Sequence, residues 1–576
     1  MLFTEFSTYL HELEQTTKRN QMVEILSQLF KIITPEEIEK AIYLLQGRLA
    51  PAFLPLEIGV SDKLCINAIS SLLSVPKTKV NEWYQEIGDL GDVAEKHISS
   101  LINQMSVLDV YNSLYQMAQI SGEGAVSKKV EILSSLLSKN GGKEAKYIIR
   151  MVLGSLRLGV GDPTILDALS FSYTGNKNLR PPIERAFNLS SDLGLIAKMF
   201  ILHGPEGLKN FKVSVGNPIR VALAERLSSG AEIVNKIGLC SIEPKFDGFR
   251  CQVHLQGGKI ELFSRNMENN TSMFPDLVEG LLAQVKTDSC ILEGEAVAYN
   301  PDSGEFYPFQ MTAQRKRKYN IDEISSRFPL KLFAFDLLYL NGEDITDKSY
   351  VERRSLLLKT ISSGKTVEVI PALTTDRPEK IEEYLLSLLE QGLEGVVAKR
   401  LDTPYTAGAR NFNWIKLKRS YKASLGDTID AVLLGYYKGR GLRTKFGIGA
   451  MLVGVYDEDE DKFKTIGKIG TGPTDKEWVY FKEMMNKEIL THKHPRVDAN
   501  IEADVWVEPK TVVVVQADEI TRSPVHTCGK TDTEAGYALR FPRVLGLIRD
   551  DKKAEDATSV SEIKELYQLQ KRMSLK

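Results

Sequence analysis

Lys245 is the residue whose neighbours point most directly to covalent chemistry. It lies in the segment Glu243-Pro244-Lys245-Phe246-Asp247-Gly248-Phe249-Arg250, which contains a K-x-D-G-x-R element. A lysine amine is a poor nucleophile while it is protonated, and desolvation or a neighbouring cation lowers its pKa and frees the lone pair. We expect Arg250, with bound metal, to supply that positive field. Such a lysine could attack the α-phosphate of a nucleotide, although an ordinary surface lysine beside a turn fits these few residues equally well.

The residues after Lys245 predict a close backbone approach. Asp247-Gly248 is typical of a tight turn, and a glycine there lets the main chain come near a phosphate. Six further elements follow along the chain, each with an ordinary alternative such as a core aromatic, an amphipathic strand or a surface loop. Their order and separations argue against coincidence. They are Ser264-Arg265-Asn266, Glu293-Gly294-Glu295, Phe335-Asp336-Leu337, Glu394-Gly395-Val396-Val397-Ala398-Lys399, Trp414-Ile415-Lys416-Leu417-Lys418, and Arg540-Phe541-Pro542-Arg543 together with Arg549-Asp550-Asp551-Lys552.

Strand alternation suggests what these elements could do. Alternate residues of a strand share one face, so the two carboxylates of Glu293-Gly294-Glu295 should point the same way. The same holds for Lys416 and Lys418. Phe335, at a strand, could stack on a purine. The set therefore combines a candidate nucleophile with carboxylates, candidate phosphate-binding cations and an aromatic side chain that could stack on a base.

Composition places the chain among soluble multidomain proteins. Its 576 residues suggest three or four domains at roughly 100–200 residues each, and 43% hydrophobic with 26% charged residues allows sizeable cores. The five cysteines are scattered without a C-x-x-C pair, which argues against a zinc ribbon or a disulfide framework and suits a reducing cytoplasm. We see no apolar run that could span a bilayer and no signal peptide, so no membrane partner is expected.

The net charge of -2 does not exclude nucleic acid, because binding depends on local basic patches. Three such patches accompany the candidate chemistry, and a solvated face is the alternative explanation for each. They are Arg315–Lys318, Lys416–Arg419 and Lys438–Lys445.

Hydrophobic periodicity divides the chain into three regions. Apolar spacings of three and four predict helices up to about Pro205. From about Asn217, short β-rich runs alternate with helices, which predicts an α+β domain built on antiparallel sheet. The expected elements there are strands at Cys251–Leu255, Ile260–Ser264, Cys290–Ala298 and Lys331–Leu340, and a helix at Ile381–Gln391.

A third region, from about Ser420, is again rich in short strands with glycine turns. This pattern predicts a small closed β-barrel, with the OB-fold as the first candidate, followed by a charged surface helix from Ala554. The expected strands are Ala431–Tyr437, Ala450–Tyr456, Phe463–Gly470 and Val505–Gln516. We therefore predict a helical domain over 1–210, an α+β domain over 211–419 and an OB-fold domain over 420–576.

Together these elements resemble the ATP-dependent DNA ligases of the replicative type found in archaea and eukaryotes, within the covalent nucleotidyltransferase superfamily. The resemblance covers nearly the whole chain. Arg157-Leu158-Gly159 is similar to that family's DNA-binding domain, and Asn217-Pro218-Ile219-Arg220 to the start of its nucleotidyltransferase domain. Asp518–His526 favours the archaeal branch, whereas Val514 stands where that branch would be expected to have a glutamate.

The resemblance implies a three-step reaction that seals nicks in duplex DNA during replication, repair and recombination. Lys245 would take AMP from ATP, pass it to a 5′-phosphate, and the 3′-hydroxyl would then displace it. The implied metal is Mg²⁺, with Mn²⁺ as a substitute, held by Glu295 and Glu394. Nucleotide binding is implied for Glu243, Arg250, Arg265, Glu295, Phe335, Val397, Arg410, Lys416, Lys418, Arg549 and Lys552, and DNA binding for Arg150, Arg157, Lys438, Arg440 and Arg443.

The implied partner is nicked duplex DNA, bound by a monomer associated with the nucleoid. A sliding clamp is left open as a second partner, and Gln104–Tyr111 is a weak candidate for its docking peptide, with a helical core segment as the alternative. For Arg150 and Arg157, a helix-packing turn competes with phosphate contact. The alternatives for the whole chain are an RNA ligase, an mRNA-capping-type nucleotidyltransferase and an inactive DNA-end clamp. An NAD⁺-dependent ligase is disfavoured, because the tetracysteine zinc site of that class has no counterpart here.

Overall fold

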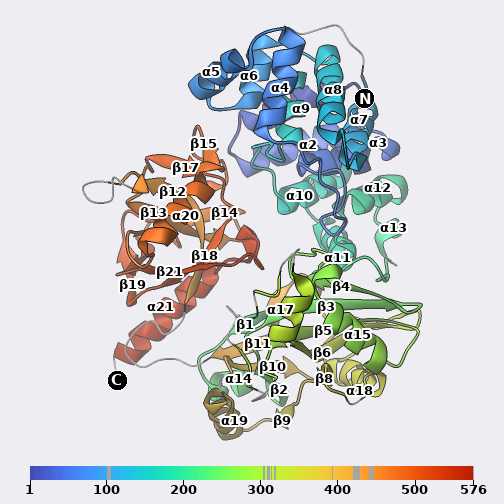
Figure 1. The fold of residues 1–576 in the computed structure, drawn as a ribbon. Helices are drawn as coiled ribbons and strands as arrows, with labels where there is room; N and C mark the ends of the chain where they lie inside the picture. The colour runs from blue at the N-terminus through green and yellow to red at the C-terminus, as the bar shows by residue number, and fades with distance from the viewer. Residues whose placement is uncertain are drawn as a thin grey trace. The chain divides into compact units, whose positions relative to one another are not determined.

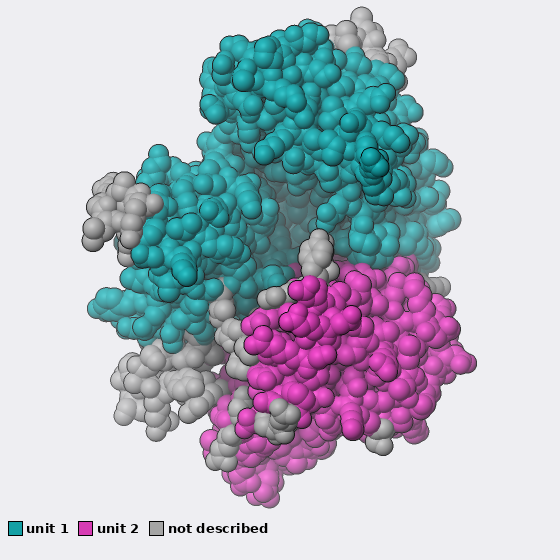
Figure 2. All heavy atoms as spheres, viewed as in Figure 1, with its two compact units in different colours: residues 1–184, 192–210, 428–576 teal, residues 185–191, 211–427 magenta. Residues whose placement is uncertain are grey.

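A computed structural model describes the chain at residues 1–99, 105–209, 211–301, 305–307, 312, 314–316, 320–362, 364–391, 393–418, 428–439 and 446–574. Contacts group it into two compact units, drawn in teal and magenta in Figure 2. One unit comprises Met1–Glu184, Asp192–Asn210 and Thr428–Lys576, and the other Arg185–Ser191 and Phe211–Asp427. The chain is thus multidomain, with a helical N-terminal region, a central α+β region and a sheet-rich C-terminal region.

The N-terminal region is helical throughout, as its apolar spacing predicts (Figure 1). Local signals set the ends: Thr34 and Glu37 form a capping box that starts α3, with Pro35 in its first turn. The helices are α1 Phe3–Glu14, α2 Arg19–Ile32, α3 Pro35–Leu45, α4 Asp62–Leu73, α5 Lys77–Ile87, α6 Leu90–His97, α7 Val107–Gln119, α8 Ala125–Lys139, α9 Lys143–Val152, α10 Asp162–Thr174, α11 Arg180–Ser190, α12 Leu193–His203 and α13 Glu206–Lys209.

The candidate clamp-docking peptide is part of this helical core. Val107, Val110 and Tyr111 are buried side chains of α7. Tyr111 also donates a hydrogen bond to the carbonyl of Leu49 at 2.5 Å. A docking peptide must expose its apolar side chains, so the structure supports the helical-core alternative over the described part of that segment; Gln104 lies outside the described residues.

The central region contains two sheets. The first has the strand order β1 (Leu223–Arg226), β11 (Arg410–Lys418), β10 (Gly395–Arg400), β2 (Cys240–Lys245) and β9 (Leu373–Thr375). Helices α14 (Gly230–Ile237) and α19 (Pro378–Glu390) bury Ile233 and Ile381 in one core cluster with Ile242 of β2 and Ile415 of β11. The lysine element thus ends a strand whose apolar residues are buried beneath these helices.

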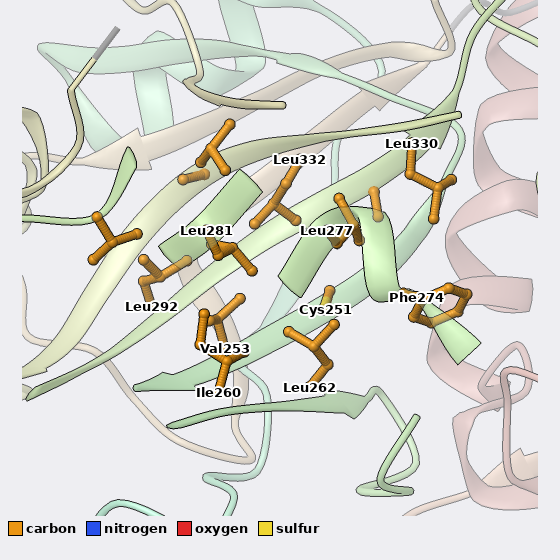
Figure 3. Packing of buried hydrophobic residues seen from close by; sticks show 14 of the residues in the cluster. Cys251, Val253, Ile260, Leu262, Phe274, Leu277, Leu281, Leu292, Leu330 and Leu332 are labelled. Carbon is orange, nitrogen blue, oxygen red and sulfur yellow. The ribbon is translucent and has the colours of Figure 1, made fainter. Parts of the chain in front are cut away.

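The second sheet has the order β4 (Lys259–Ser264), β3 (Phe249–Gln256), β5 (Ser289–Ala298), β6 (Leu330–Leu340) and β7 (Glu343–Asp344), with β8 (Val367–Val369) also paired to β6. Its core is shown in Figure 3, where Leu277 and Leu281 lie near Val253 and Leu292. The helices of this part are α15 (Pro275–Gln284), α17 (Ile321–Arg327) and α18 (Tyr350–Thr360), with a short 3₁₀ turn η1 (Thr271–Met273).

Both central sheets are mainly antiparallel, as predicted, and the predicted strands and helix are present with ends shifted by at most a few residues. Two pairs are parallel, β1 with β11 and β6 with β8. In the first sheet, Gly395 of β10 lies opposite Lys245 of β2 on one side and Lys418 of β11 on the other. In the second, Arg250 of β3 lies opposite Glu295 of β5. Sheet register therefore places charged residues from three motifs, and Gly395 from a fourth, opposite one another on neighbouring strands.

The C-terminal region is built on a curled eight-stranded sheet with a separate two-stranded sheet formed by β19 and β20. Val505–Gln516 was expected to be one strand, and this is wrong: it forms two strands, with Pro509 between them, because proline lacks the N–H that a central strand needs. The elements are β12 Ile429–Tyr437, β13 Ala450–Asp457, β14 Lys462–Ile469, α20 Asp475–Asn486, β15 Ile489–Leu490, β16 Val497–Asp498, β17 Val505–Val507, β18 Val512–Gln516, β19 Glu519–Ser523, β20 Gly536–Arg540, β21 Arg543–Ile548, η3 Ala554–Asp556 and α21 Val560–Ser574.

None of the helices in the described parts of the chain combines the length and the apolar character needed to cross a membrane.

Candidate active site

Lys245 lies at the end of β2 in an ion-paired cluster. Its ammonium donates to one carboxylate oxygen of Glu394, and Lys418 pairs with the other oxygen. All three side chains are about a quarter exposed. Burial pushes the pKa of Lys245 down, but the carboxylates of Glu394 and Glu295 outweigh it and raise that pKa above its ordinary value. The sequence suggested that a neighbouring cation would lower this pKa, whereas among the protein side chains the two carboxylates dominate and raise it.

Two glycines allow this arrangement for reasons of backbone packing. A Cβ at Gly395 would lie 2.2 Å from the carbonyl oxygen of Leu417 on β11. A Cβ at Gly248 would lie 2.3 Å from the carbonyl oxygen of Ala296 on β5. The sequence suggested that Gly248 admits a phosphate; the structure shows that it admits the neighbouring strand. Both glycines bring strands carrying charged residues closer together than any side chain would permit.

Glu295 and Glu394 are the carboxylates expected to bind metal. Burial raises the pKa of Glu295 to about 7, despite the opposing charges of Lys245 and Arg250. Burial acts the same way on Glu394, but Lys245 and Lys418 outweigh it and hold the pKa of Glu394 well below its usual range. Within the described residues no group of three or more His, Cys, Asp or Glu side chains forms a ready cation cage. Mg²⁺ commonly uses one or two carboxylates with water and substrate phosphates, so this sparse pair fits it.

Arg250 is held by a buried network. Its Nη2 donates to Oε2 of Glu293 at 2.6 Å and its Nη1 donates to the carbonyl of Ala222 at 2.8 Å. Glu293 is completely buried. The Nε–H of Arg250 is buried without a hydrogen-bond acceptor among the described residues, which marks it as a donor that a ligand could satisfy only by reaching this buried atom. Glu293 is therefore the partner that orients Arg250, a role the sequence did not suggest.

Aromatic rings form the wall beside these charges. The rings of Phe335 and Trp414 meet edge to face with centroids 5.9 Å apart. The guanidinium of Arg250 lies 5.1 Å from the Phe335 centroid and the ammonium of Lys399 lies 4.8 Å from it. Val397 packs against the same cluster and is partly buried. Phe335 and Val397, the two residues expected to enclose adenine, therefore border one apolar cluster.

Glu243 occupies a second buried network. Its Oε2 pairs with the ammonium of Lys399 at 2.8 Å, and its Oε1 accepts from the hydroxyl of Tyr350 at 2.5 Å. Arg354 lies 3.6 Å from the same carboxylate. Lys399 also donates to the carbonyl of Phe335 at 3.0 Å. Contact with adenine by the Glu243 side chain would use a carboxylate that already has buried partners.

Three further residues that were predicted to bind nucleotide lie within or directly after strands of the two central sheets. Arg265 directly follows β4, Arg410 begins β11, and Lys416 lies opposite Val397 in the β10–β11 pairing. All three are partly buried and have partners in the structure. Arg410 and Lys416 share β11 with Lys418, and Arg265 follows the strand that pairs with β3, which carries Arg250.

The last predicted cations lie in the C-terminal region. Arg549 donates twice to Asp551, at 2.8 Å each, and lies 3.6 Å from Asp430, and Lys552 pairs with Asp430. Val514, where a glutamate was expected, is buried and lies directly across from Asp430 on the adjacent strand. Asp430 therefore supplies a carboxylate at this point of the sheet.

Arg150, expected to contact DNA, is a core residue of α9. It is 4% exposed, and its Nε, Nη1 and Nη2 donate to Asp89, Glu14 and Asp92 respectively. Three of the five N–H donors of this guanidinium point to carboxylates, and the buried side chain is poorly placed to reach a phosphate, so the structure supports the helix-packing alternative for Arg150. Arg157 keeps a partly exposed side chain, pairs with Asp89 at 2.8 Å and has a left-handed backbone with φ of 57°.

The residues of the three basic patches differ in their exposure. Arg315 is buried and pairs with Asp276, so this residue is not part of a solvated basic face. Lys438 is exposed at the end of β12. Arg317, Lys318, Arg419, Arg440 and Arg443, along with the rest of 440–445, lie outside the described residues.

Comparison with known proteins identifies the family of this site. Models of three domain families match the chain: the DNA ligase N terminus at residues 2–170, the ATP dependent DNA ligase domain at 221–418 and the ATP dependent DNA ligase C terminal region at 443–552. A probable DNA ligase of Dictyoglomus turgidum is 55% identical over 572 residues, covering 99% of this chain and 98% of the relative. The chain belongs to the ATP-dependent DNA ligase family. The Lys245 cluster lies within the segment that the ATP-dependent ligase domain matches.

Other relatives agree with this placement. A DNA ligase of Sulfophobococcus zilligii is 43% identical over 97% of this chain and 96% of its own length, and a probable DNA ligase of Aquifex aeolicus is 41% identical over the full length of both. A solved structure of mycobacterial DNA ligase D with ATP and MES covers 59% of this chain and 97% of that protein at 25% identity and a TM-score of 0.34. The protein is a ligase enzyme that uses ATP, and the RNA-ligase, capping and inactive-clamp alternatives are not favoured.

Proposed function

We propose that Lys245 is the residue that carries AMP between ATP and the 5′-phosphate of a nick. The observation that supports this most is its place in the structure: it shares the carboxylate of Glu394 with Lys418, and the buried network of Arg250 lies on the neighbouring β3–β5 strands. In the first step the Lys245 nitrogen forms a bond to the α-phosphorus and pyrophosphate leaves. Catalysis of this type consists mainly of positioning and charge neutralisation.

The other residues take positioning roles in this proposal. Lys416 and Lys418 bind the α-phosphate, and Phe335 with Val397 encloses adenine. Arg250 offers its Nε–H to ribose or phosphate, while Arg265 and Arg410 contact sugar or phosphate at the rim. Glu243 fixes Lys399 beneath the base. Arg549 and Lys552 act on the departing pyrophosphate, which requires that they leave Asp430 and Asp551.

Glu295 and Glu394 would hold Mg²⁺, or Mn²⁺ in its place, which neutralises phosphate charge when bound. For binding, Glu295 must lose its proton and Glu394 must share its oxygens with the lysines. The raised pKa of Glu295 makes this ionisation the pH-sensitive part of loading. Water and substrate phosphates would supply further oxygen ligands.

We further propose that the C-terminal sheet closes as an OB-fold, that the regions 1–210, 211–419 and 420–576 are separate domains, and that the protein binds nicked duplex DNA as a monomer in the cytoplasm. Exposed cations such as Lys438 and the partly exposed Arg157 would contribute phosphate contacts, so binding should weaken steeply as salt rises. Of the docking segment for a sliding clamp only Gln104 lies outside the described residues, and its described part gives no support for that partner.

One assay tests the central proposal. The full-length protein is incubated with Mg²⁺ and, in parallel, with α-labelled ATP, GTP or NAD⁺, and the labelled protein is then chased with nicked duplex. The expected result is a labelled band with ATP that disappears as sealed DNA forms. Lys380, an exposed lysine of α19 in the same unit, supplies the matched control: Lys380→Arg should label normally, while Lys245→Arg should not. A labelled Lys245→Arg protein would refute the assignment.

A further inference from the structure

Tyr405 has a position that no motif suggested. It is 5% exposed, and its hydroxyl lies at the centre of the network around Arg250. The hydroxyl donates to Oε2 of Glu293 at 2.8 Å and accepts from the backbone N–H of Ala222 at 2.9 Å. Nη2 of Arg250 lies 3.4 Å from the same oxygen. Burial and the nearby Glu293 carboxylate raise the pKa of Tyr405 well above its ordinary value, so the hydroxyl keeps its proton.

The network closes on Arg250 from two directions. Ala222 gives its carbonyl to Nη1 of Arg250 and its N–H to Tyr405, so one peptide segment is bonded to both side chains. Glu293 receives Arg250 and Tyr405 on the same oxygen, Oε2. Its other oxygen, Oε1, accepts from Nε2 of Gln252 at 3.2 Å. Both oxygens of the carboxylate that orients Arg250 are therefore fixed.

Gln252 is in turn locked to the segment that precedes β1. Its amide accepts from the N–H of Ile219 at 2.7 Å and donates to the Ile219 carbonyl at 3.0 Å. His254 continues the chain of bonds, with Nε2 2.9 Å from Oε1 of Gln252 and Nδ1 accepting from the N–H of Gly216 at 2.9 Å. Buried side chains of β3 thereby hold the segment 216–222, here called the strap. Tyr405 links the end of the strap to Glu293, because its hydroxyl is hydrogen-bonded to both Ala222 and Glu293.

The ring of Tyr405 has a separate task from its hydroxyl. It meets Trp414 edge to face at 5.8 Å and lies 5.9 Å from the guanidinium of Arg353. A phenylalanine would keep both contacts. It would leave the Ala222 N–H without its acceptor and Glu293 without one of its three donors. Buried donors without acceptors are costly, so the strap and the carboxylate would both relax.

We propose that the Tyr405 hydroxyl is a positioning group for Arg250, holding its guanidinium against the aromatic wall so that the Nε–H faces the reacting nucleotide. This rests on the proposed function of the Lys245 site. Tyr405 itself touches no substrate; it acts through Glu293 and Ala222. A misdirected guanidinium lowers the rate of nucleotidyl transfer because small errors of position are amplified in the transition state.

The test is a double-variant cycle on single-turnover self-adenylation of the full-length protein with labelled ATP. Tyr405→Phe should slow adduct formation about tenfold, as expected for loss of a buried hydrogen bond that orients a charged group. Arg250→Ala should slow adduct formation further. Both single variants should change the same kinetic parameter, either the maximal rate or the half-saturating ATP concentration. The double variant should match Arg250→Ala within about twofold, because without Arg250 there is nothing left for Tyr405 to position.

Tyr43→Phe is the matched control. Tyr43 is buried in the helical region and donates to Asp192 at 2.8 Å, so the same chemical group is removed with no link to Arg250. It should form the adduct at the wild-type rate. The proposal is overturned if the two losses multiply in the double variant, if Tyr405→Phe reacts like the wild type, or if it fails to fold under conditions where Tyr43→Phe folds. Failure of the proposed function would look different: the wild type itself would form no adduct that depends on Lys245.

Discussion

The buried ion pair between Arg353 and Asp336 yields a stability prediction whose size follows from the structure. Arg353 of α18 donates to both oxygens of Asp336 on β6, at 2.8 and 3.1 Å. The two side chains are 1% and 0% exposed. Asp336→Asn keeps the shape but removes the charge, leaving the guanidinium buried with only the carbonyls of Lys348 and Thr403 as full partners. Removing one partner of such a pair costs about 3–5 kcal/mol.

That cost converts into a measurable shift. With a urea dependence of about 3 kcal/mol per molar for a unit of this size, the unfolding midpoint of the central unit should fall by about 1 M or more. Trp414 is the tryptophan of that unit, so the experiment uses a background in which Trp83, Trp478 and Trp506 are phenylalanine. At urea concentrations between the two midpoints, the background protein should still form the adenylate adduct and the variant should not.

Two controls separate the buried pair from charge in general. Lys380 and Glu383 form a pair that is 47% and 64% exposed, so Glu383→Gln should leave the urea midpoint of the central unit essentially unchanged. Replacing both buried partners, Asp336→Leu with Arg353→Met, should restore much of the stability because no charge is left unpaired. If Asp336→Asn unfolds at the same urea concentration as Glu383→Gln, the pair does not hold α18 on β6 and the reasoning fails.

Three further predictions concern the reaction. Lys245→Arg should form no adduct in a labelled-ATP assay, because arginine does not give up its proton. The Mg²⁺ concentration for half-maximal adduct formation should rise as the pH falls through about 7, since Glu295 then gains a proton and ligates metal poorly, and a flat dependence would contradict its role. Replacing Arg549 and Lys552 together by alanine should abolish self-adenylation yet spare sealing of a pre-adenylated nick; equal loss on both substrates would assign them to DNA binding or folding.

Local patterns in the sequence were sufficient for the strands and for the motif residues they carry. The alternation in Glu293-Gly294-Glu295 places both carboxylates on β5, and the Lys245 element ends β2 as expected. The break between the two strands within Val505–Gln516 is also a local property, because Pro509 lacks the backbone N–H that a continuous strand would need there. Strand periodicity is a short-range property, so it can be read without knowing the tertiary structure.

Side-chain partners could not be read in the same way. Lys245 meets Glu394 across 149 positions, and Arg250 lies near Tyr405 across 155. The direction of the pKa shift of Lys245 depends on the first of these contacts, so a local reading predicted the opposite direction. Arg150 shows the same limit: its helix spacing is compatible with a surface cation or a core one, and only the positions of Glu14, Asp89 and Asp92 decide. Tyr405 belongs to no motif, and the sequence carried no signal for its role.

The raised pKa of Lys245 is consistent with a nucleophile that is activated only when the site is loaded. Glu394 pairs with the ammonium groups of both Lys245 and Lys418, and its charge helps to raise the pKa of Lys245 above its ordinary value. On the proposed function, a Glu394 carboxylate that held Mg²⁺ would stabilise the Lys245 ammonium less. Burial, which lowers the pKa of Lys245, would then be less opposed. If Lys245 is the nucleophile proposed above, the ion pair with Glu394 that favours its protonated form is therefore the pair whose loss would prepare it for attack.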